Sequence, residues 1–229
     1  MGSDYITLWT YQAPEVLKMI LEDGIAYCDF KDDFALETQE FAHAYDWMCE
    51  QMKLRITPPE SPNAKFPFWA WKYYNGKKEA KPRRTYDNMR PAQEAVFMEL
   101  KIHKSRVLCS DFELWHFPLG GWSLSEEDIE DQKKKEEGWN LIFDESFNEP
   151  YFTGGVKWED RPIQATFWCI KKEDVVYADL LQTQPGRKAL KVKRIFKTRK
   201  CPLPTESGKR ATNLVKATTE SGNDNQIRK

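Results

Sequence analysis

The segment from Ser110 to His116 gathers an Asp, a Glu and a His within six residues, among aromatic side chains. Histidine titrates near neutral pH, so His116 could act as a general base that is oriented by Asp111 or Glu113. In an extended chain, residues 111 and 113 share one face and His116 points to the other, so an Asp–His pair needs a turn. Alternatively, Asp111 caps the next segment and His116 is hydrogen-bonded structurally. We retain Asp111 and His116 as candidate catalytic residues.

The other reactive residue types form no recognisable motif. The five cysteines are never spaced as C-x-x-C, and with three scattered histidines they provide no zinc-binding pattern. The sequence contains no Walker loop, no Gly-rich dinucleotide turn and no G-x-S-x-G elbow. We therefore predict no metal site, and covalent catalysis has no local support.

The composition indicates a folded protein with an uneven charge distribution. Of the 229 residues, 40% are hydrophobic and 14% aromatic, including nine tryptophans, which excludes a wholly disordered chain. The net charge of −1 conceals an asymmetry, because residues 182–229 carry 13 Lys and Arg against 3 Asp and Glu. Residues 1–181 carry 22 against 33. Such a basic segment could contact phosphates or fold back onto the acidic body.

Hydropathy predicts a cytoplasmic protein. The first residues lack the basic and apolar regions of a secretory signal, and no apolar run approaches the ~20 residues of a membrane span. We therefore expect no membrane partner.

Apolar periodicity and turn residues predict a single α+β domain with a mixed, mainly antiparallel sheet and flanking helices. The expected strands span 5–11, 25–28, 66–71, 95–102, 163–170 and 175–177, with Pro67 favouring an edge position for the third. The expected helices follow Pro14, span 37–55, and run from Ser123 through Lys135.

The basic region divides into two predicted parts. Residues 189–196 alternate apolar and basic side chains, which favours a last edge strand docked on the acidic body. Beyond Cys201 apolar residues are sparse, which favours disorder. The predicted organisation is a domain over 4–181, a docked basic extension over 182–200 and a disordered tail over 201–229.

Polar residues interrupt the strongest strand patterns. Gln12 ends the first strand, and Gln164 and Thr166 lie within the 163–170 strand. A buried polar group without a partner costs about 1–3 kcal/mol, so we expect these three side chains to bind a ligand. Trp9 would stack on that ligand.

The aromatic segment from Phe66 to Tyr74 is followed by basic residues up to Arg84. Aromatic rings can stack on bases while Lys and Arg pair with phosphates, so this segment could contact nucleic acid. Alternatively, alternate aromatics pack in the core and the lysines are solvated.

Five sequence blocks occur together in order: Leu8–Gln12, Tyr45–Met48, Trp69–Trp71, Ser110–His116 and Ile163–Trp168. Over roughly residues 5–181 they resemble domain-of-unknown-function family 3841, which is found in bacteria and their phages. The resemblance implies no particular activity.

The order of elements also resembles that of ADP-ribosyltransferases, through an opening strand, a helix ending near Gly24, and a late strand before Lys172–Val176. Those enzymes place an Arg or His on the first strand and a Glu on the late strand, where this chain has Trp9, Gln12, Gln164 and Thr166. The resemblance implies binding of a nucleotide-like small molecule, with NAD as the candidate cofactor, by a degenerate or unusual ADP-ribosyltransferase. The alternative is a non-catalytic interaction protein that contacts nucleic acid or a partner protein through its aromatic segment and basic tail.

Overall fold

The computed structural model describes residues 3–28, 41–82, 94–127, 129–183 and 190–197. The strands are β1 (Tyr5–Gln12), β2 (Ile25–Tyr27), β3 (Phe68–Tyr73), β4 (Ala95–His103), β5 (Leu108–Asp111), β6 (Ile163–Phe167), β7 (Cys169–Lys171), β8 (Val175–Thr183) and β9 (Leu190–Lys197). The α-helices are α1 (Pro14–Asp23), α3 (Ala42–Arg55), α4 (His116–Gly120), α5 (Gln132–Trp139) and α6 (Pro150–Thr153).

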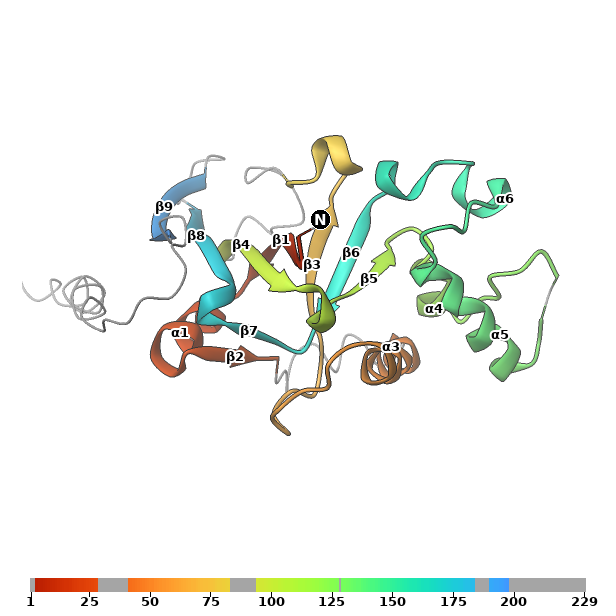
Figure 1. The fold of residues 1–229 in the computed structure, drawn as a ribbon, viewed down its shortest axis with the longest axis horizontal. Helices are drawn as coiled ribbons and strands as arrows, with labels where there is room; N and C mark the ends of the chain where they lie inside the picture. Colours follow the sequence, from red (N-terminus) through yellow and green to blue (C-terminus); the bar gives the residue numbers. More distant parts are fainter. Residues whose placement is uncertain (1–2, 29–40, 83–93, 128, 184–189, 198–229) are drawn as a thin grey trace, which may run out of the picture. The chain divides into compact units, whose positions relative to one another are not determined.

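Within the described residues, seven strands form one sheet in the order β5-β6-β3-β1-β4-β8-β9, and β2 pairs with β7 in a second, small sheet (Figure 1). Every strand pairing recorded for these residues is antiparallel. The predicted α+β fold with a mainly antiparallel sheet is therefore confirmed.

Local signals explain the two long helices. Pro14 occupies the first turn of α1, and Gly24 ends the helix with a φ of 79°, which glycine adopts without steric penalty. In α3, Ala44, Met48 and Met52 recur every four residues and are all fully buried, so one stripe of the helix faces the core. The first residues of the predicted 37–55 helix lie outside the described residues.

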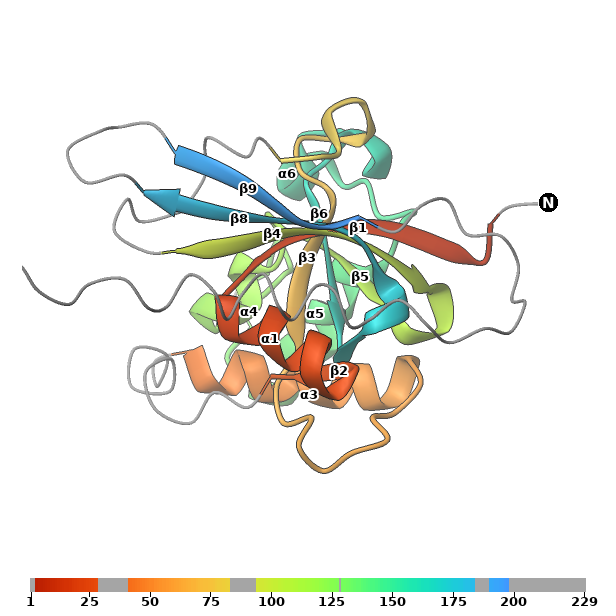
Figure 2. The same ribbon diagram turned by 90° about the vertical axis from the view of Figure 1, so that its left-hand side faces the viewer.

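The two faces of the large sheet pack against different helices. Leu8 of β1 and Met98 of β4 lie in one core cluster with α1 residues such as Leu17. On the other face, Leu108 of β5 lies in a second cluster with Met48 of α3. In Figure 2, β8 and β9 run nearly horizontally, whereas β3 runs nearly vertically. Neighbouring strands of a sheet are rotated relative to one another, and this rotation accumulates from strand to strand.

Three sequence predictions need correction. The strand containing Phe68 is central rather than an edge strand, because Pro67 precedes its first residue and removes no hydrogen bond from the ladder. The predicted 163–170 strand divides at Trp168, and its second part pairs with β2 instead of continuing in the large sheet.

The third correction concerns the helix expected to begin at Ser123. The α5 helix begins at Gln132, where the preceding Asp131 accepts a hydrogen bond from the Lys134 backbone N–H at 2.9 Å. Asp131 is therefore the N-cap, and the described acidic residues Glu126, Glu127 and Glu130 lie before the helix.

The predicted last edge strand is present as β9, which pairs with β8 from Thr183↔Leu190 to Tyr177↔Lys197. It lies at one edge of the sheet. The limits of the domain and its basic extension stay predictions, and the disorder predicted over 201–229 falls outside the described residues.

We expect native trypsin digestion to cut first at Lys200, Lys209 or Arg210 and to spare the bonds after Lys191 and Lys193. Backbone hydrogen bonds to β8 hold the latter two residues in an extended ladder that the protease cannot engage. Mass spectrometry of the fragments over time measures the order of cleavage. Early cleavage at Lys191 or Lys193 would contradict the docked extension.

Candidate functional site

Asp111 is the last residue of β5, and its side chain is 1% exposed. One carboxylate oxygen accepts hydrogen bonds from the backbone N–H groups of Glu113 and Leu114 at 2.9 and 3.1 Å. The other oxygen accepts one from Arg161 Nη1 at 3.0 Å. Asp111 therefore caps the turn that follows β5, as in the structural alternative drawn from the sequence.

Arg161 completes this arrangement from the other end of the connection between β5 and β6. It is 5% exposed, precedes β6 by two residues, and also donates to the carbonyl oxygens of Val156 and Phe147 at 2.7 and 2.5 Å. The Asp111–Arg161 ion pair thus ties together the two ends of residues 112–162. Sequence reasoning missed Arg161, because the 49 residues between the two partners hide their proximity.

His116 is exposed at the start of α4, and its Nδ1 lies 3.1 Å from the Glu113 carbonyl oxygen. A carbonyl oxygen only accepts, so Nδ1 carries the hydrogen and the neutral ring presents the lone pair of Nε2. Among the described residues, the structure records no hydrogen bond between His116 and Asp111. His116 can therefore act as a base at Nε2, but Asp111 does not orient it.

A row of side chains crosses one face of the large sheet, and we call it the central row. The register pairs Ser110 with Gln164, Gln164 with Trp71, Trp71 with Trp9, Trp9 with Glu99, and Glu99 with Tyr177. Residues paired in this way project from the same face, about 5 Å apart. Ser110 and Tyr177 at the two ends are buried, and the four members between them are partly exposed.

Charged and aromatic groups meet at the Glu99 end of the central row. Trp9 Nε1 donates to Glu99 Oε2 at 3.3 Å, and Lys81 Nζ lies 3.4 Å from the same oxygen. The Lys81 ammonium also lies 5.4 and 5.5 Å from the ring centroids of Phe97 and Tyr177. Cation–π attraction and the carboxylate together hold a positive charge over this part of the sheet.

At the other end, the central row connects to the segment that contains His116. The Trp71 ring contacts Tyr74 and Phe112, both at 5.1 Å between centroids, and Phe112 contacts His116 at 5.0 Å. The His116 imidazole therefore lies two ring contacts away from Trp71. At the same end of the row, Ser110 Oγ is buried and has no hydrogen-bond partner within the described part of the chain.

The structure brings together only some of the residues predicted for ligand binding. Trp9 and Gln164 share the central row. Gln12 projects from the opposite face, where its Nε2 donates to Thr10 Oγ1 at 2.7 Å. Thr166 is fully buried, with its Oγ1 4.0 Å from Met48 Sδ and 3.4 Å from the Leu108 carbonyl oxygen.

The aromatic segment follows the core-packing alternative for most of its length. Phe68 and Ala70 are buried in the cluster beneath α1, and the Trp69 ring packs against Trp115 at 5.3 Å. Trp71 remains partly exposed. Because successive side chains of a strand project from opposite faces, Phe68 and Ala70 face the cluster beneath α1, whereas Trp69 and Trp71 share the other face of β3.

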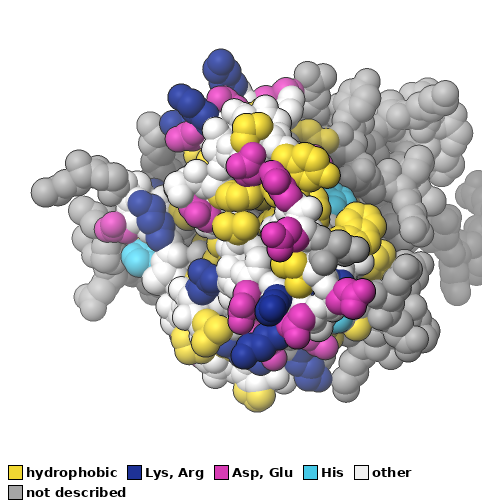
Figure 3. All heavy atoms as spheres, turned by 90° about the vertical axis from the view of Figure 1, so that its right-hand side faces the viewer, with side chains coloured by type: hydrophobic (Ala, Val, Ile, Leu, Met, Phe, Trp, Pro, Cys, Tyr) yellow, Lys and Arg dark blue, Asp and Glu magenta, His cyan; other side chains and the backbone are white. Residues whose placement is uncertain are grey.

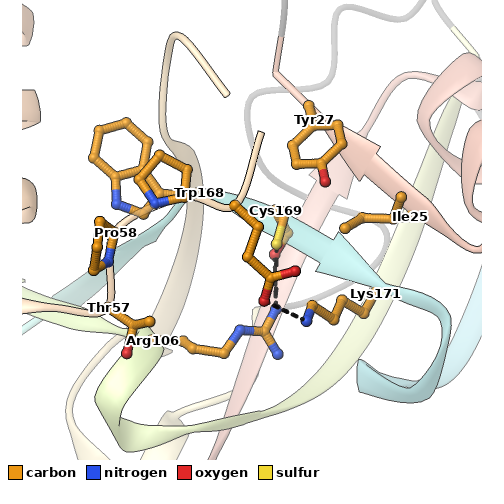
Figure 4. Close-up of a pocket in the computed structure, with 10 residues that line it drawn as sticks. Ile25, Tyr27, Thr57, Pro58, Arg106, Trp168, Cys169 and Lys171 are labelled. Carbon is orange, nitrogen blue, oxygen red and sulfur yellow. Dashed lines mark hydrogen bonds and ion pairs between the residues drawn. The ribbon is translucent and has the colours of Figure 1, made fainter. Parts of the chain in front are cut away.

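A small cavity of about 30 Å³ lies between β2, β7 and the loop after α3 (Figure 4). Arg106 at its wall is paired through both terminal nitrogens with Asp174 at 2.8 Å, and Lys171 lies 3.3 Å from Glu60. Both cations that line this cavity are already paired with carboxylates, so we assign no phosphate-binding role to them.

Burial favours the protonated thiol at three of the described cysteines. It raises the pKa of Cys49 and of Cys109 to about 11. Burial also raises the pKa of Cys169, although Arg106 partly opposes the shift. Since the thiolate is the nucleophile, these three cysteines are poor candidates for covalent catalysis at neutral pH.

A family model described as "Domain of unknown function (DUF3841)" matches residues 7–135. The chain belongs to the DUF3841 family. The region matched to DUF3841 includes Trp9, Trp71, Glu99 and His116, and it ends before Gln164. No curated protein and no solved structure matches this DUF3841 chain, so the resemblance to ADP-ribosyltransferases stays a prediction.

Within the described residues of this DUF3841 protein, no helix is long and apolar enough to cross a bilayer. His, Cys, Asp and Glu side chains in these ranges do not form groups of three or more that could hold a metal ion.

Replacing Asp111 with Ala should lower the free energy of unfolding by about 3–5 kcal/mol, because Arg161 would remain buried without its counter-charge. Urea denaturation followed by circular dichroism measures this loss. Glu113→Ala is the matched control, since the Glu113 side chain is exposed and an effect within about 0.5 kcal/mol is expected. Equal effects of the two substitutions would show that the ion pair does not hold the connection.

Proposed function

We propose that the central row binds a nucleotide-like small molecule of the NAD or ADP-ribose type. The observation that carries this proposal is the register of Trp9 and Trp71, two partly exposed indoles side by side between the amide of Gln164 and the carboxylate of Glu99. Aromatic side chains bind planar bases by stacking, at about 1–3 kcal/mol per base. The two flanking polar groups can bond to the edges and hydroxyls that stacking leaves unsatisfied.

Each polar member of this surface suits a different part of such a ligand. The Gln164 amide both donates and accepts, as the edge of a base or nicotinamide carboxamide requires. Glu99 can accept from ribose hydroxyls, since a carboxylate is an acceptor. Lys81 keeps 41% of its side chain exposed while it contacts Glu99, so its ammonium can turn toward a phosphate.

Any acid–base step in this proposal falls to His116 acting alone. Its Nδ1 hydrogen is held by the Glu113 carbonyl oxygen, and ring contacts through Phe112 place it near the Trp71 end of the row. A degenerate or unusual ADP-ribosyltransferase would use Nε2 to accept a proton from an attacking nucleophile. Asp111 has no part in this step, because it is engaged with Arg161.

The proposal is tested by isothermal calorimetry of the full chain with NAD, ATP and ADP-ribose, accompanied by tryptophan fluorescence. We expect Trp71→Leu to weaken binding by about 1–3 kcal/mol, roughly 5- to 150-fold in Kd, through the loss of one stacking partner. Trp122→Leu is the matched control, because this indole is 61% exposed and lies outside the central row. Absence of heat with all three ligands, or equal effects of the two substitutions, would reject the site.

The basic strand β9 favours a second candidate function, contact with nucleic acid. Lys191, Lys193, Arg194 and Lys197 lie in this strand, which forms an edge of the sheet. Phosphate contacts by such a cluster would make affinity fall steeply with salt, with a slope of about −0.7 to −0.9 per neutralised phosphate.

Fluorescence anisotropy with labelled single-stranded DNA across a salt series tests this function. We expect the double substitution Lys191→Gln and Lys193→Gln to reduce the salt slope. Lys133→Gln with Lys134→Gln is the control, since both lysines are exposed in α5, away from the basic strand and the aromatic segment in the sequence. An unchanged slope in the β9 variant would remove this candidate.

A further inference from the structure

The connection between β5 and β6 carries a run of contacting aromatic rings, which we call the aromatic ladder, and the two rings at its ends are exposed. It consists of Trp122, Phe117, Phe152 and Tyr151, whose successive ring centroids lie 6.4, 5.6 and 4.9 Å apart. Trp122 is 61% exposed and Tyr151 is 76% exposed. Two large aromatic side chains at the ends of a continuous ring contact form an apolar surface available to a partner.

The exposed indole of Trp122 is held in place by its surroundings. Its backbone N–H donates to the Phe117 carbonyl oxygen at 2.9 Å, and its own carbonyl oxygen accepts from Trp139 Nε1 at 2.7 Å. A Cβ atom at Gly120 would lie 2.6 Å from the indole ring, so this position needs glycine for the ring to pack against the backbone. A ring fixed in this way loses little conformational entropy when a partner binds.

The segment that carries the aromatic ladder has a net negative charge, although Lys135 Nζ lies 3.4 Å from the Gly121 carbonyl oxygen beside Trp122. Residues 112–160 contain thirteen Asp and Glu against four Lys, a net charge of −9. Figure 3 shows this side of the molecule, where hydrophobic side chains gather on the upper half with Asp and Glu side chains among them. Glu149 directly precedes α6, the helix that carries Tyr151 and Phe152. An apolar surface on a segment of net negative charge is complementary to cationic side chains with long aliphatic stems.

We propose that the aromatic ladder docks a Lys- and Arg-rich peptide segment of a partner protein. Guanidinium groups stack on Trp and Tyr rings within about 6 Å, and the surrounding carboxylates pair with the remaining positive charge. The negative charge disfavours nucleic acid at this surface, and it also disfavours a second copy, which would bring the same carboxylates together. This docking is independent of ligand binding at the central row.

The test uses the full chain and a fluorescein-labelled peptide of five Arg-Gly repeats, with the corresponding Glu-Gly peptide as the reference. We expect binding of the Arg-Gly peptide only. Trp122→Ala and Tyr151→Ala should each raise its Kd about three- to thirtyfold, with all charges of the protein unchanged. Leu54→Ala is the control, because Leu54 is an apolar side chain that is 79% exposed on α3, and it should leave the Kd unchanged.

Thermal melting of each variant distinguishes loss of docking from loss of folding, and Tyr151→Ala removes a side chain that is mostly solvated. Binding that responds to salt but not to either aromatic substitution would reduce the interaction to nonspecific charge attraction and overturn the proposal. Failure of the wild-type chain to bind the Arg-Gly peptide would do the same. Sedimentation velocity showing a dimer that Tyr151→Ala dissociates would assign the surface to a second copy instead.

Discussion

The uninterrupted antiparallel ladder between β1 and β4 is the constraint on which the rest of this structure depends. Eight consecutive pairs, from Tyr5↔His103 to Gln12↔Val96, join the two strands without a bulge. Because side chains alternate along each strand, this register assigns every residue of both strands to one of two faces, and a shift of one residue would exchange them. Leu8 therefore faces the α1 core, whereas its neighbour Trp9 faces the partly exposed side.

The same register explains why a polar row can exist in a stable sheet. Glu99 would be costly at a position buried beneath α1, but in the central row it meets the Trp9 indole N–H and the Lys81 ammonium at the edge of solvent. The aromatic residues Phe97, Tyr177 and Trp9 cluster on this face of β1, β4 and β8. The partly exposed polar row and the buried core thus use alternate residues of the same strands.

The Asp111–Arg161 pair plays the corresponding part for the long connection after β5. A buried ion pair contributes little net stability compared with an apolar pair of the same size, but losing one partner is expensive, so it selects one arrangement of the chain. The β5–β6 ladder and the backbone hydrogen bond from Phe112 N–H to the Pro162 carbonyl oxygen hold the same end of the connection. Within the connection, Phe112 and His116 lie toward Trp71, whereas Trp122 and Tyr151 are exposed.

Local patterns were sufficient to predict the elements that short-range chemistry controls. The first strand, the helix from Pro14 to Gly24 and the alternating β9 strand follow from residue type and spacing, and the five ordered blocks pointed to the DUF3841 family. The predicted boundaries of two elements were wrong. The α5 helix begins after the Asp131 cap instead of at Ser123, and the predicted 163–170 strand divides at Trp168 into β6 and β7.

The composition of the site depended on contacts between residues far apart in the chain. From the sequence, Asp111 could pair with His116 or cap the next segment. In the tertiary structure, Asp111 forms an ion pair with Arg161, fifty residues away. Likewise, Gln12 and Gln164 were both predicted to bind a ligand from strands, and only the register showed that they project from opposite faces. The sequence thus determined which residues could do chemistry, whereas strand order and register decided which of them meet, because antiparallel pairing between distant segments is a property of the folded sheet.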